Sequence, residues 1–427
     1  MPVTVKSQIL NAAGGALVPG IAAAMCLPIV MFSLMGYDIN PAFVLAPLIA
    51  IALLMNFGRT GLAYLSAGVM GLISIMVANK VSADGELIKH VFSMVLIMFA
   101  PSFLFLGKYI SKSSDISRVF YWLSLFSSLF LIVVAARIFY LEQDVRIYLG
   151  PFGLAAMNAE FLGLPVFATF GVLSLAYLVC LQAMIICGTL IAGKTNKAVS
   201  LLMWVALFCA TFLIIGSDSR SAQVLLVWIV GSIVFYAIRN SDYRRNALIA
   251  IIAVVIAFAV TYARGMDGGR MVNSIEAISA QKHWKKKADE FATGRIELAI
   301  EGVKEVVASP IIGSGFSGYG RYSTEGKSQA LIANTSTHIY YLTLLWKGGL
   351  IFFIPFMAMI LLNLKSAITG TKMTEKSPER FFAWAAVLMA FGPMAMAWDI
   401  LIVPSAGAVA FFLFGLLGGL KNQVQKV

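Results

Sequence analysis

Charged residues are scarce in this chain. Only 12% of its 427 residues are Asp, Glu, Lys or Arg, and 60% are hydrophobic, whereas a soluble domain is about 25% charged. One soluble globule could not bury so much apolar surface, but membrane spans of about 20 residues each could carry it. The apolar runs are long and unbroken, which argues against a membrane β-barrel. We therefore predict an all-α polytopic membrane protein.

Cysteine and histidine are also rare. The four cysteines, Cys26, Cys180, Cys187 and Cys209, all lie in apolar runs, so neither a disulfide framework nor a zinc site is expected. No His, Asp or Glu cluster has the spacing of metal ligands. The glycine-rich stretch 313–320 lacks the Gly-Lys-Ser/Thr of a nucleotide-binding loop and is interpreted as a turn. We expect no metal and no cofactor, and with no clear cleavable signal peptide the first span should remain as an anchor.

The apolar runs predict about twelve spans. They are placed near 13–35, 42–57, 61–79, 88–107, 119–141, 162–192, 198–216, 221–238, 246–263, 338–364, 381–398 and 400–420. The run 162–192 is too long for a simple span, so we expect it to be tilted or to begin along the interface. Three parts follow: residues 1–263 with nine spans, a large loop at 264–337 with amphipathic helices, and residues 338–427 with three spans and a tail.

The distribution of Lys and Arg predicts the orientation. If the N-terminus is cytoplasmic, the opposite short loops hold five basic residues, Lys80, Lys89, Arg137, Arg146 and Arg220. The cytoplasmic side then holds sixteen: Lys6, Arg59, Lys108, Lys112, Arg118, Lys194, Lys197, Arg239, Arg244, Arg245, Lys365, Lys372, Lys376, Arg380, Lys421 and Lys426. Sixteen against five predicts that both termini are inside and that the 264–337 loop is external. The net charge of +12 is therefore attributed to membrane orientation, and no nucleic-acid partner is expected.

The external loop contains one clear helical pattern. Residues 294–308 place apolar side chains on one face, with Thr293 as a candidate N-cap and Ser309-Pro310 as a stop. Before it lies the basic run 282–287, which we expect to face solvent or lipid headgroups.

Three polar residues of the external side could carry chemistry. Arg220 follows a span and offers a planar fork of donors for a phosphate, although it could also be an interfacial anchor paired with Asp218. Arg295 begins the 294–308 helix, where free backbone N–H groups and a guanidinium together favour an anion. A carboxylate such as Asp289 or Glu297 could instead be its partner.

His338 opens a span at the membrane surface. A histidine there titrates near neutral pH and can accept the proton of a hydroxyl. The alternative interpretation is an ordinary interfacial aromatic beside Tyr340 and Tyr341.

Taken in order, these motifs resemble the O-antigen ligase and polymerase superfamily of bacterial inner membranes. The resemblance rests on Ser219-Arg220 after a span, Gly294-Arg295 and Ser309-Pro310 in a long external loop, and His338 opening a span that contains Gly348-Gly349. The chain departs from the family pattern at Ile339, where asparagine is usual, and at Leu298-Ala299, where an aromatic is usual.

The resemblance implies metal-independent, inverting transfer of a glycan from undecaprenyl diphosphate to a sugar hydroxyl of the lipid A core, on the periplasmic face of the inner membrane. By the family positions, His338 would be the general base, and Arg220 and Arg295 would bind the diphosphate and stabilise it as it leaves. The basic residues Arg264, Arg270, Arg321 and Lys285 would suit a phosphorylated acceptor.

Two other functions remain open. An O-antigen polymerase would use the same chemistry, but polymerases often show two external loops of comparable size, whereas this chain has one. A transporter or lipid flippase belongs to a different class, in which broken helices and charges lie at mid-membrane. Lys347 and Asp399 are the residues of this chain that most resemble that pattern.

Overall fold

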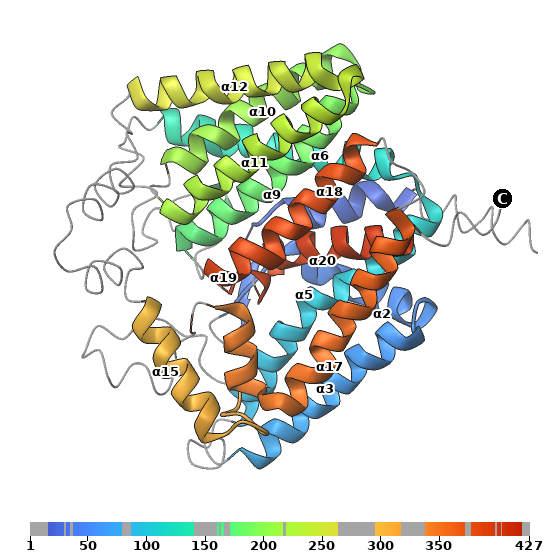
Figure 1. Ribbon diagram of the computed structural model, residues 1–427, viewed down its shortest axis with the longest axis vertical. Helices are drawn as coiled ribbons and strands as arrows, with labels where there is room; N and C mark the ends of the chain where they lie inside the picture. Colours follow the sequence, from blue (N-terminus) through green and yellow to red (C-terminus); the bar gives the residue numbers. More distant parts are fainter. Residues whose placement is uncertain are drawn as a thin grey trace, which may run out of the picture.

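The computed structural model describes residues 16–29, 31–34, 37–78, 87–140, 160–161, 164–165, 171–216, 219–263, 295–316, 337, 339–371, 377–397, 399–402 and 404–420. Within these ranges the chain is a bundle of long apolar helices (Figure 1). Among the described residues, nine helices are long and apolar enough to cross a membrane, and three shorter apolar helices cover Ala16–Cys26, Pro41–Met55 and Ser405–Gly419. The predicted all-α polytopic membrane fold is confirmed, and each of the twelve predicted spans has a helix.

Twelve labelled α-helices of ten or more residues form most of the described structure. They are α2 (Ala46–Met55), α3 (Gly58–Val77), α5 (Leu87–Ser113), α6 (Ile116–Tyr140), α9 (Gly171–Ala192), α10 (Lys197–Gly216), α11 (Arg220–Arg239), α12 (Arg244–Ala263), α15 (Arg295–Ala308), α17 (Tyr340–Thr371), α18 (Pro378–Met389) and α20 (Pro404–Gly419). Short elements complete the description: η1 (Pro41–Leu45), η2 (Ser241–Tyr243), the π-helical η3 (Ala390–Met394), α19 (Ala395–Ala397) and η4 (Ile400–Ile402).

Two predicted spans have the wrong bounds. The first was expected to reach residue 35, but an antiparallel strand pair, β1 (Phe32–Leu34) with β2 (Tyr37–Ile39), follows the helix. The sixth was expected to begin at 162, but β3 (Glu160–Phe161) pairs with β4 (Leu164–Pro165), and α9 begins only at Gly171. Hydrophobicity alone cannot separate a short apolar hairpin from a helix end, because both are rich in apolar residues.

Close backbone packing holds the centre of the bundle together. Helices α5 and α20 pack against each other more extensively than any other described pair. A Cβ atom at Gly107 of α5 would overlap the Phe412 carbonyl, and one at Gly415 of α20 would overlap the Leu104 carbonyl. Since lipid tails are as apolar as leucine, small residues that allow such contact are what drives helices together in a membrane.

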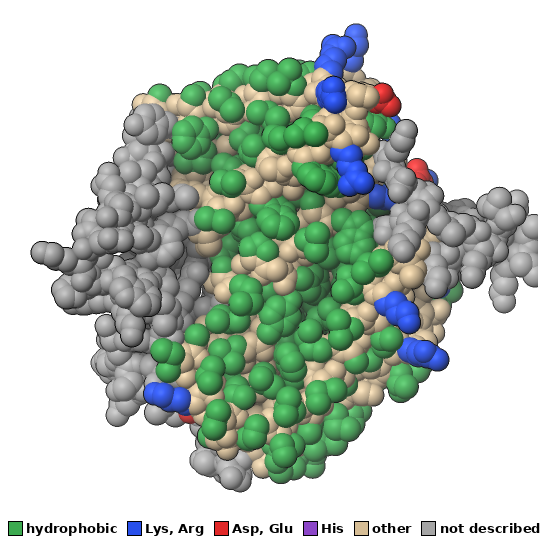
Figure 2. Space-filling model, viewed as in Figure 1, with side chains coloured by type: hydrophobic (Ala, Val, Ile, Leu, Met, Phe, Trp, Pro, Cys, Tyr) green, Lys and Arg blue, Asp and Glu red, His purple; other side chains and the backbone are tan. Residues whose placement is uncertain are grey.

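The helices alternate in direction, so the bundle has two ends. The basic end carries eleven of the described Lys and Arg residues: Arg59, Lys108, Lys112, Arg118, Lys194, Lys197, Arg239, Arg244, Arg245, Lys365 and Arg380. In Figure 2 most visible Lys and Arg side chains follow one edge, beside a broad apolar face. At the opposite end, here called the loop end, α11 and α17 begin and α12 ends (Figure 1). Which end faces the cytoplasm stays a prediction.

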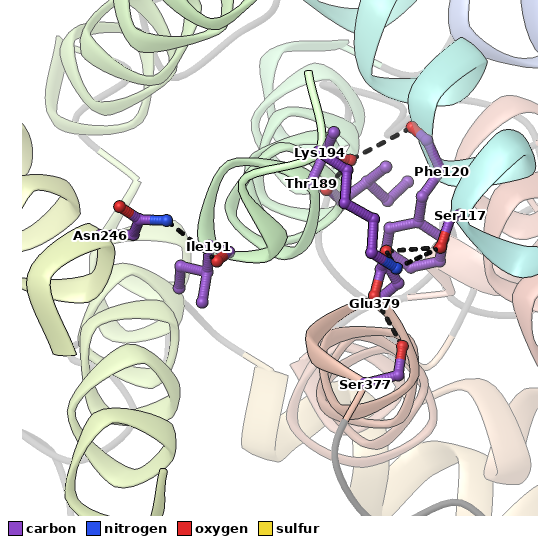
Figure 3. Close-up of polar contacts among 9 residues, drawn as sticks. Ser117, Phe120, Thr189, Ile191, Lys194, Asn246, Ser377 and Glu379 are labelled. Carbon is purple, nitrogen blue, oxygen red and sulfur yellow. Dashed lines mark hydrogen bonds and ion pairs between the residues drawn. The ribbon is translucent and has the colours of Figure 1, made fainter. Parts of the chain in front are cut away.

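A buried carboxylate joins three segments at the basic end (Figure 3). Glu379 opens α18 with only 1% of its surface exposed. It forms an ion pair with Lys194 at 3.2 Å and accepts hydrogen bonds from Ser117 of α6 at 2.7 Å and from Ser377 at 2.6 Å. Because each partner comes from a different segment, this carboxylate fixes the α9–α10 turn and α6 against α18.

Candidate functional site

Two of the predicted site residues are the first residues of helices at the loop end. Arg220 begins α11 and Arg295 begins α15. The first turn of a helix has free N–H groups and a partial positive charge. A guanidinium on the first residue adds to this positive charge. The guanidinium and the free N–H groups together favour a bound anion. The side chains of both arginines lie outside the described residues, so their roles stay predictions.

The start of α11 is held firmly by its neighbours. Ser219 is the N-cap, and its side-chain oxygen accepts a hydrogen bond from the Ala222 N–H at 3.3 Å. The Tyr177 hydroxyl of α9 donates to the Ser221 hydroxyl at 2.7 Å. No acidic residue lies in this first turn. The backbone that carries Arg220 is therefore fixed by its neighbours.

His338 lies outside the described residues, but both of its neighbours are placed. The Thr337 N–H donates to the Thr343 hydroxyl at 3.2 Å, and the two threonine hydroxyls are 2.8 Å apart. The Thr337 hydroxyl also donates to the Ile339 carbonyl at 3.0 Å and accepts from the Ile339 N–H at 3.3 Å. Tyr340 is fully buried within the protein. The peptide around position 338 is thus tied to the first turn of α17.

Helix α15 packs on the same peptide. A Cβ atom at Gly302 would overlap the methyl group of Thr337, so this glycine lets α15 approach the residue before His338. The predicted helix 294–308 is confirmed to within one residue by α15. Two of the three predicted catalytic positions, Arg295 and His338, therefore belong to segments that touch.

The glycine-rich stretch after α15 docks into a break in α17. At Gly349 the backbone leaves the helical conformation, with φ 62° and ψ −176°. Around this break the Leu350 N–H donates to the Pro310 carbonyl at 2.9 Å, and the Ile351 N–H donates to the Ile311 carbonyl at 3.1 Å. The inserted segment therefore satisfies backbone groups that the break would otherwise leave without partners inside the membrane protein.

The docked segment also donates hydrogen bonds to α17. The Ser314 and Gly315 N–H groups donate to the carbonyls of Trp346 and Lys347, each at 2.9 Å. From α3, the Ser74 hydroxyl donates to the Ile312 carbonyl at 2.6 Å. The described part of this stretch, up to residue 316, is more than the simple turn that the sequence indicates, because it fixes α15 to both α17 and α3.

Two charged residues far apart in sequence meet beside this break. Lys347 is 3% exposed, and its ammonium lies 4.0 Å from the centre of the Trp346 ring. Asp399, in the connection between α19 and η4, is 6% exposed and interacts electrostatically with Lys347. The sequence singles out both residues, but not their proximity, which depends on the packing of α17 against the last spans.

The remaining predicted substrate-binding residues, Arg264, Arg270, Arg321 and Lys285, lie outside the described residues. In the described part of the chain no three His, Cys, Asp or Glu residues are grouped closely enough to hold a metal ion.

The site thus belongs to a polytopic helical membrane protein that gathers helix N-termini at one end of its bundle. A family model described as O-antigen ligase matches residues 204–357. The match covers most of α10, all of α11, α12 and α15 and the first half of α17, and so includes Arg220, Arg295 and His338. This match supports the resemblance to the O-antigen ligase superfamily that the motifs indicate, and it suggests an enzyme of the membrane glycosyltransferase type. No curated protein matches the sequence.

Proposed function

We propose that the protein is an O-antigen ligase. It would transfer a glycan from undecaprenyl diphosphate to a sugar hydroxyl of the lipid A core, at the periplasmic face of a bacterial inner membrane. The observation that carries the proposal is the family match over residues 204–357, the region that contains all three predicted site residues. The proposed domain organisation follows: 1–263 and 338–427 form the membrane frame, and 264–337 forms the periplasmic loop.

Each residue has one task in the proposed reaction. His338 accepts the proton of the acceptor hydroxyl, and the oxygen attacks the anomeric carbon of the donor sugar. The bond between that carbon and the diphosphate oxygen breaks, and undecaprenyl diphosphate leaves with both electrons. Arg220 and Arg295 stabilise the negative charge that develops on the leaving group. A single displacement inverts the sugar carbon and forms no covalent enzyme intermediate.

The placement of the helices supports this division of tasks. Arg220 and Arg295 both begin helices, where the dipole and free N–H groups favour a diphosphate. A lipid-borne donor could approach the loop end sideways from the membrane. The acceptor would bind through Arg264, Arg270, Arg321 and Lys285, whose charges match a phosphorylated core.

The test is an incubation of the purified protein with a lipid-linked glycan and rough lipopolysaccharide. Glycan on the lipopolysaccharide is the expected product. A longer lipid-linked chain would identify a polymerase and overturn the proposal. Movement of the lipid-linked glycan across a proteoliposome membrane with no product would identify a flippase.

A further inference from the structure

Lys108 of α5 is a buried cation at the basic end of the bundle. Only 9% of its surface is exposed. Within the part of the chain that the structure describes, its ammonium has one hydrogen-bond partner, the Thr60 hydroxyl of α3 at 3.1 Å. An ammonium has three N–H donors, so two of them find no acceptor among the described residues. A buried charge in this state is costly, and a bound anion would remove that cost.

The helices around Lys108 supply no carboxylate. Helices α2, α3 and α5, which pack together (Figure 1), are described from end to end and contain no Asp or Glu, and neither does α20 on the other side of α5. Asp115 follows α5, but it interacts electrostatically with Arg380. By contrast, Lys194 at the same end of the bundle has Glu379 as its partner at 3.2 Å. The counter-charge of Lys108 therefore does not come from the helices that bury it.

Further positive charge lies beside this ammonium. Lys112 is one turn further along α5, is exposed, and interacts electrostatically with Lys108. Its ammonium donates to the side-chain oxygen of Asn56, 2.6 Å away, in the turn between α2 and α3. Arg59, also exposed, immediately precedes Thr60. Like charges one helical turn apart repel each other, so an anion that contacts both lysines would replace repulsion by attraction.

The start of α3 adds backbone donors to the same place. The helix begins at Gly58, and its N-cap, Phe57, makes no side-chain hydrogen bond to the first turn, which contains no acidic residue. The first N–H groups of a helix have no partner within the helix and carry a partial positive charge. Because Lys108 bonds to Thr60 in this first turn, a buried ammonium from α5 and the helix N-terminus of α3 face the same position.

We propose that the first turn of α3 together with Lys108, Lys112 and Arg59 forms a binding site for a phosphate group, and that the headgroup of an anionic phospholipid supplies it. A phosphate has several oxygens that accept from ammonium, guanidinium and backbone N–H groups at once. The site is at the opposite end of the bundle from Arg220 and Arg295, so it does not depend on the proposed glycan transfer.

The surroundings of the site favour a lipid as the source of the phosphate. Leu54 of α2 and Leu62 of α3 lie on either side of the α2–α3 turn in the sequence, and they are 75% and 58% exposed. Apolar surface for acyl chains therefore adjoins the charged groups. Basic pockets between membrane helices are places where anionic headgroups bind. A soluble phosphate would satisfy the same polar groups, so the experiment has to separate the two sources.

The binding test titrates the purified full-length protein in neutral detergent with phosphatidylglycerol or with zwitterionic phosphatidylcholine, and counts bound lipids by native mass spectrometry. The wild type should prefer phosphatidylglycerol. Lys108→Met keeps the length of the side chain without its charge, and should bind phosphatidylglycerol about tenfold more weakly, the loss expected for one charged hydrogen bond. Arg59→Gln, at an exposed position, should weaken it about fivefold. The matched control is Lys197→Met, which removes an exposed cation that begins α10 at the same end and should leave binding unchanged.

A second measurement identifies the source of the phosphate through the thermal midpoint. Phosphatidylglycerol in nanodiscs should raise the midpoint of the wild type more than that of Lys108→Met, relative to phosphatidylcholine, whereas millimolar inorganic phosphate should change neither. Stabilisation of the wild type but not of Lys108→Met by inorganic phosphate alone would overturn the assignment to a lipid. If Lys108→Met and Arg59→Gln both bind phosphatidylglycerol as the wild type does, the site itself is refuted.

Discussion

Gly349→Ala should separate the docked segment from the membrane helices without preventing insertion. The backbone at Gly349 has φ 62° and ψ −176°, a region that essentially only glycine adopts, so a side chain there costs about 1–3 kcal/mol. A Cβ atom would also overlap the Ile311 carbonyl oxygen. Relieving that overlap requires the segment 310–313 to move away from the break.

Movement of this segment would break the two hydrogen bonds that Leu350 and Ile351 donate to it, each worth about 0.5–1.5 kcal/mol. Together with the backbone strain, the total is about 2–6 kcal/mol against docking. Since each 1.4 kcal/mol is a factor of ten, even the lower figure shifts the docking equilibrium about 30-fold. The rest of α17 packs along α3 and α20 and should keep its place.

Hydrogen exchange followed by mass spectrometry measures this change directly. The amides of Ser314, Gly315 and Leu350 should exchange about 30-fold faster or more, because local opening controls their exchange. The rate of glycan transfer should also fall in this variant, since α15 carries Arg295. Gly68→Ala in α3 is the control, because a Cβ atom there meets nothing within 4 Å. Unchanged exchange in Gly349→Ala would refute the view that the glycine break holds the segment.

Four further outcomes are expected. His338→Ala should abolish transfer while donor binding persists, and normal transfer by that purified variant would remove the histidine from the mechanism. Arg220→Lys and Arg295→Lys should each restore little of the activity lost in the alanine variants, because lysine lacks the planar fork; full rescue of both would exclude bidentate diphosphate binding. Glu379→Gln should lower the thermal midpoint in detergent by an amount that corresponds to about 1–3 kcal/mol, since it weakens charged hydrogen bonds, with transfer unaffected in the surviving fraction. A chelator should leave transfer unchanged, and a clear loss would indicate a metal.

The sequence predicts those features that depend on local composition. Membrane spans can be recognised in the sequence because every residue of a span must be compatible with lipid. The 294–308 helix can be recognised by its apolar face and its Ser309-Pro310 stop. The sequence does not predict the strand pairs at Phe32–Leu34 and Leu164–Pro165, which are apolar like the spans that they adjoin.

Features that depend on long-range contact could not be predicted from local patterns. Gly348-Gly349 is visible as a motif, but only the structure places 310–315 against it. In the same way Lys347 and Asp399 stand out as misplaced charges, yet their interaction requires α17 and the last spans to be packed together. The sequence does contain one indication of this pair. Two opposite charges, each near the loop end of a span, are better tolerated together than apart.

The three predicted site residues are carried by two groups of helices. Arg220 begins α11, which packs on α9, α10, α12 and α18, whereas α15 packs on α17, and α17 on α3 and α20. Arg295 and His338 therefore belong to one group, fixed by Thr337 and by the break at Gly349. Their geometry should survive changes in the first group, while the position of Arg220 relative to them depends on how α18 and α20 pack between the groups. Substitutions where α18 and α20 pack between the two groups should thus weaken the stabilisation of the departing diphosphate. They should affect the proton transfer from the acceptor less.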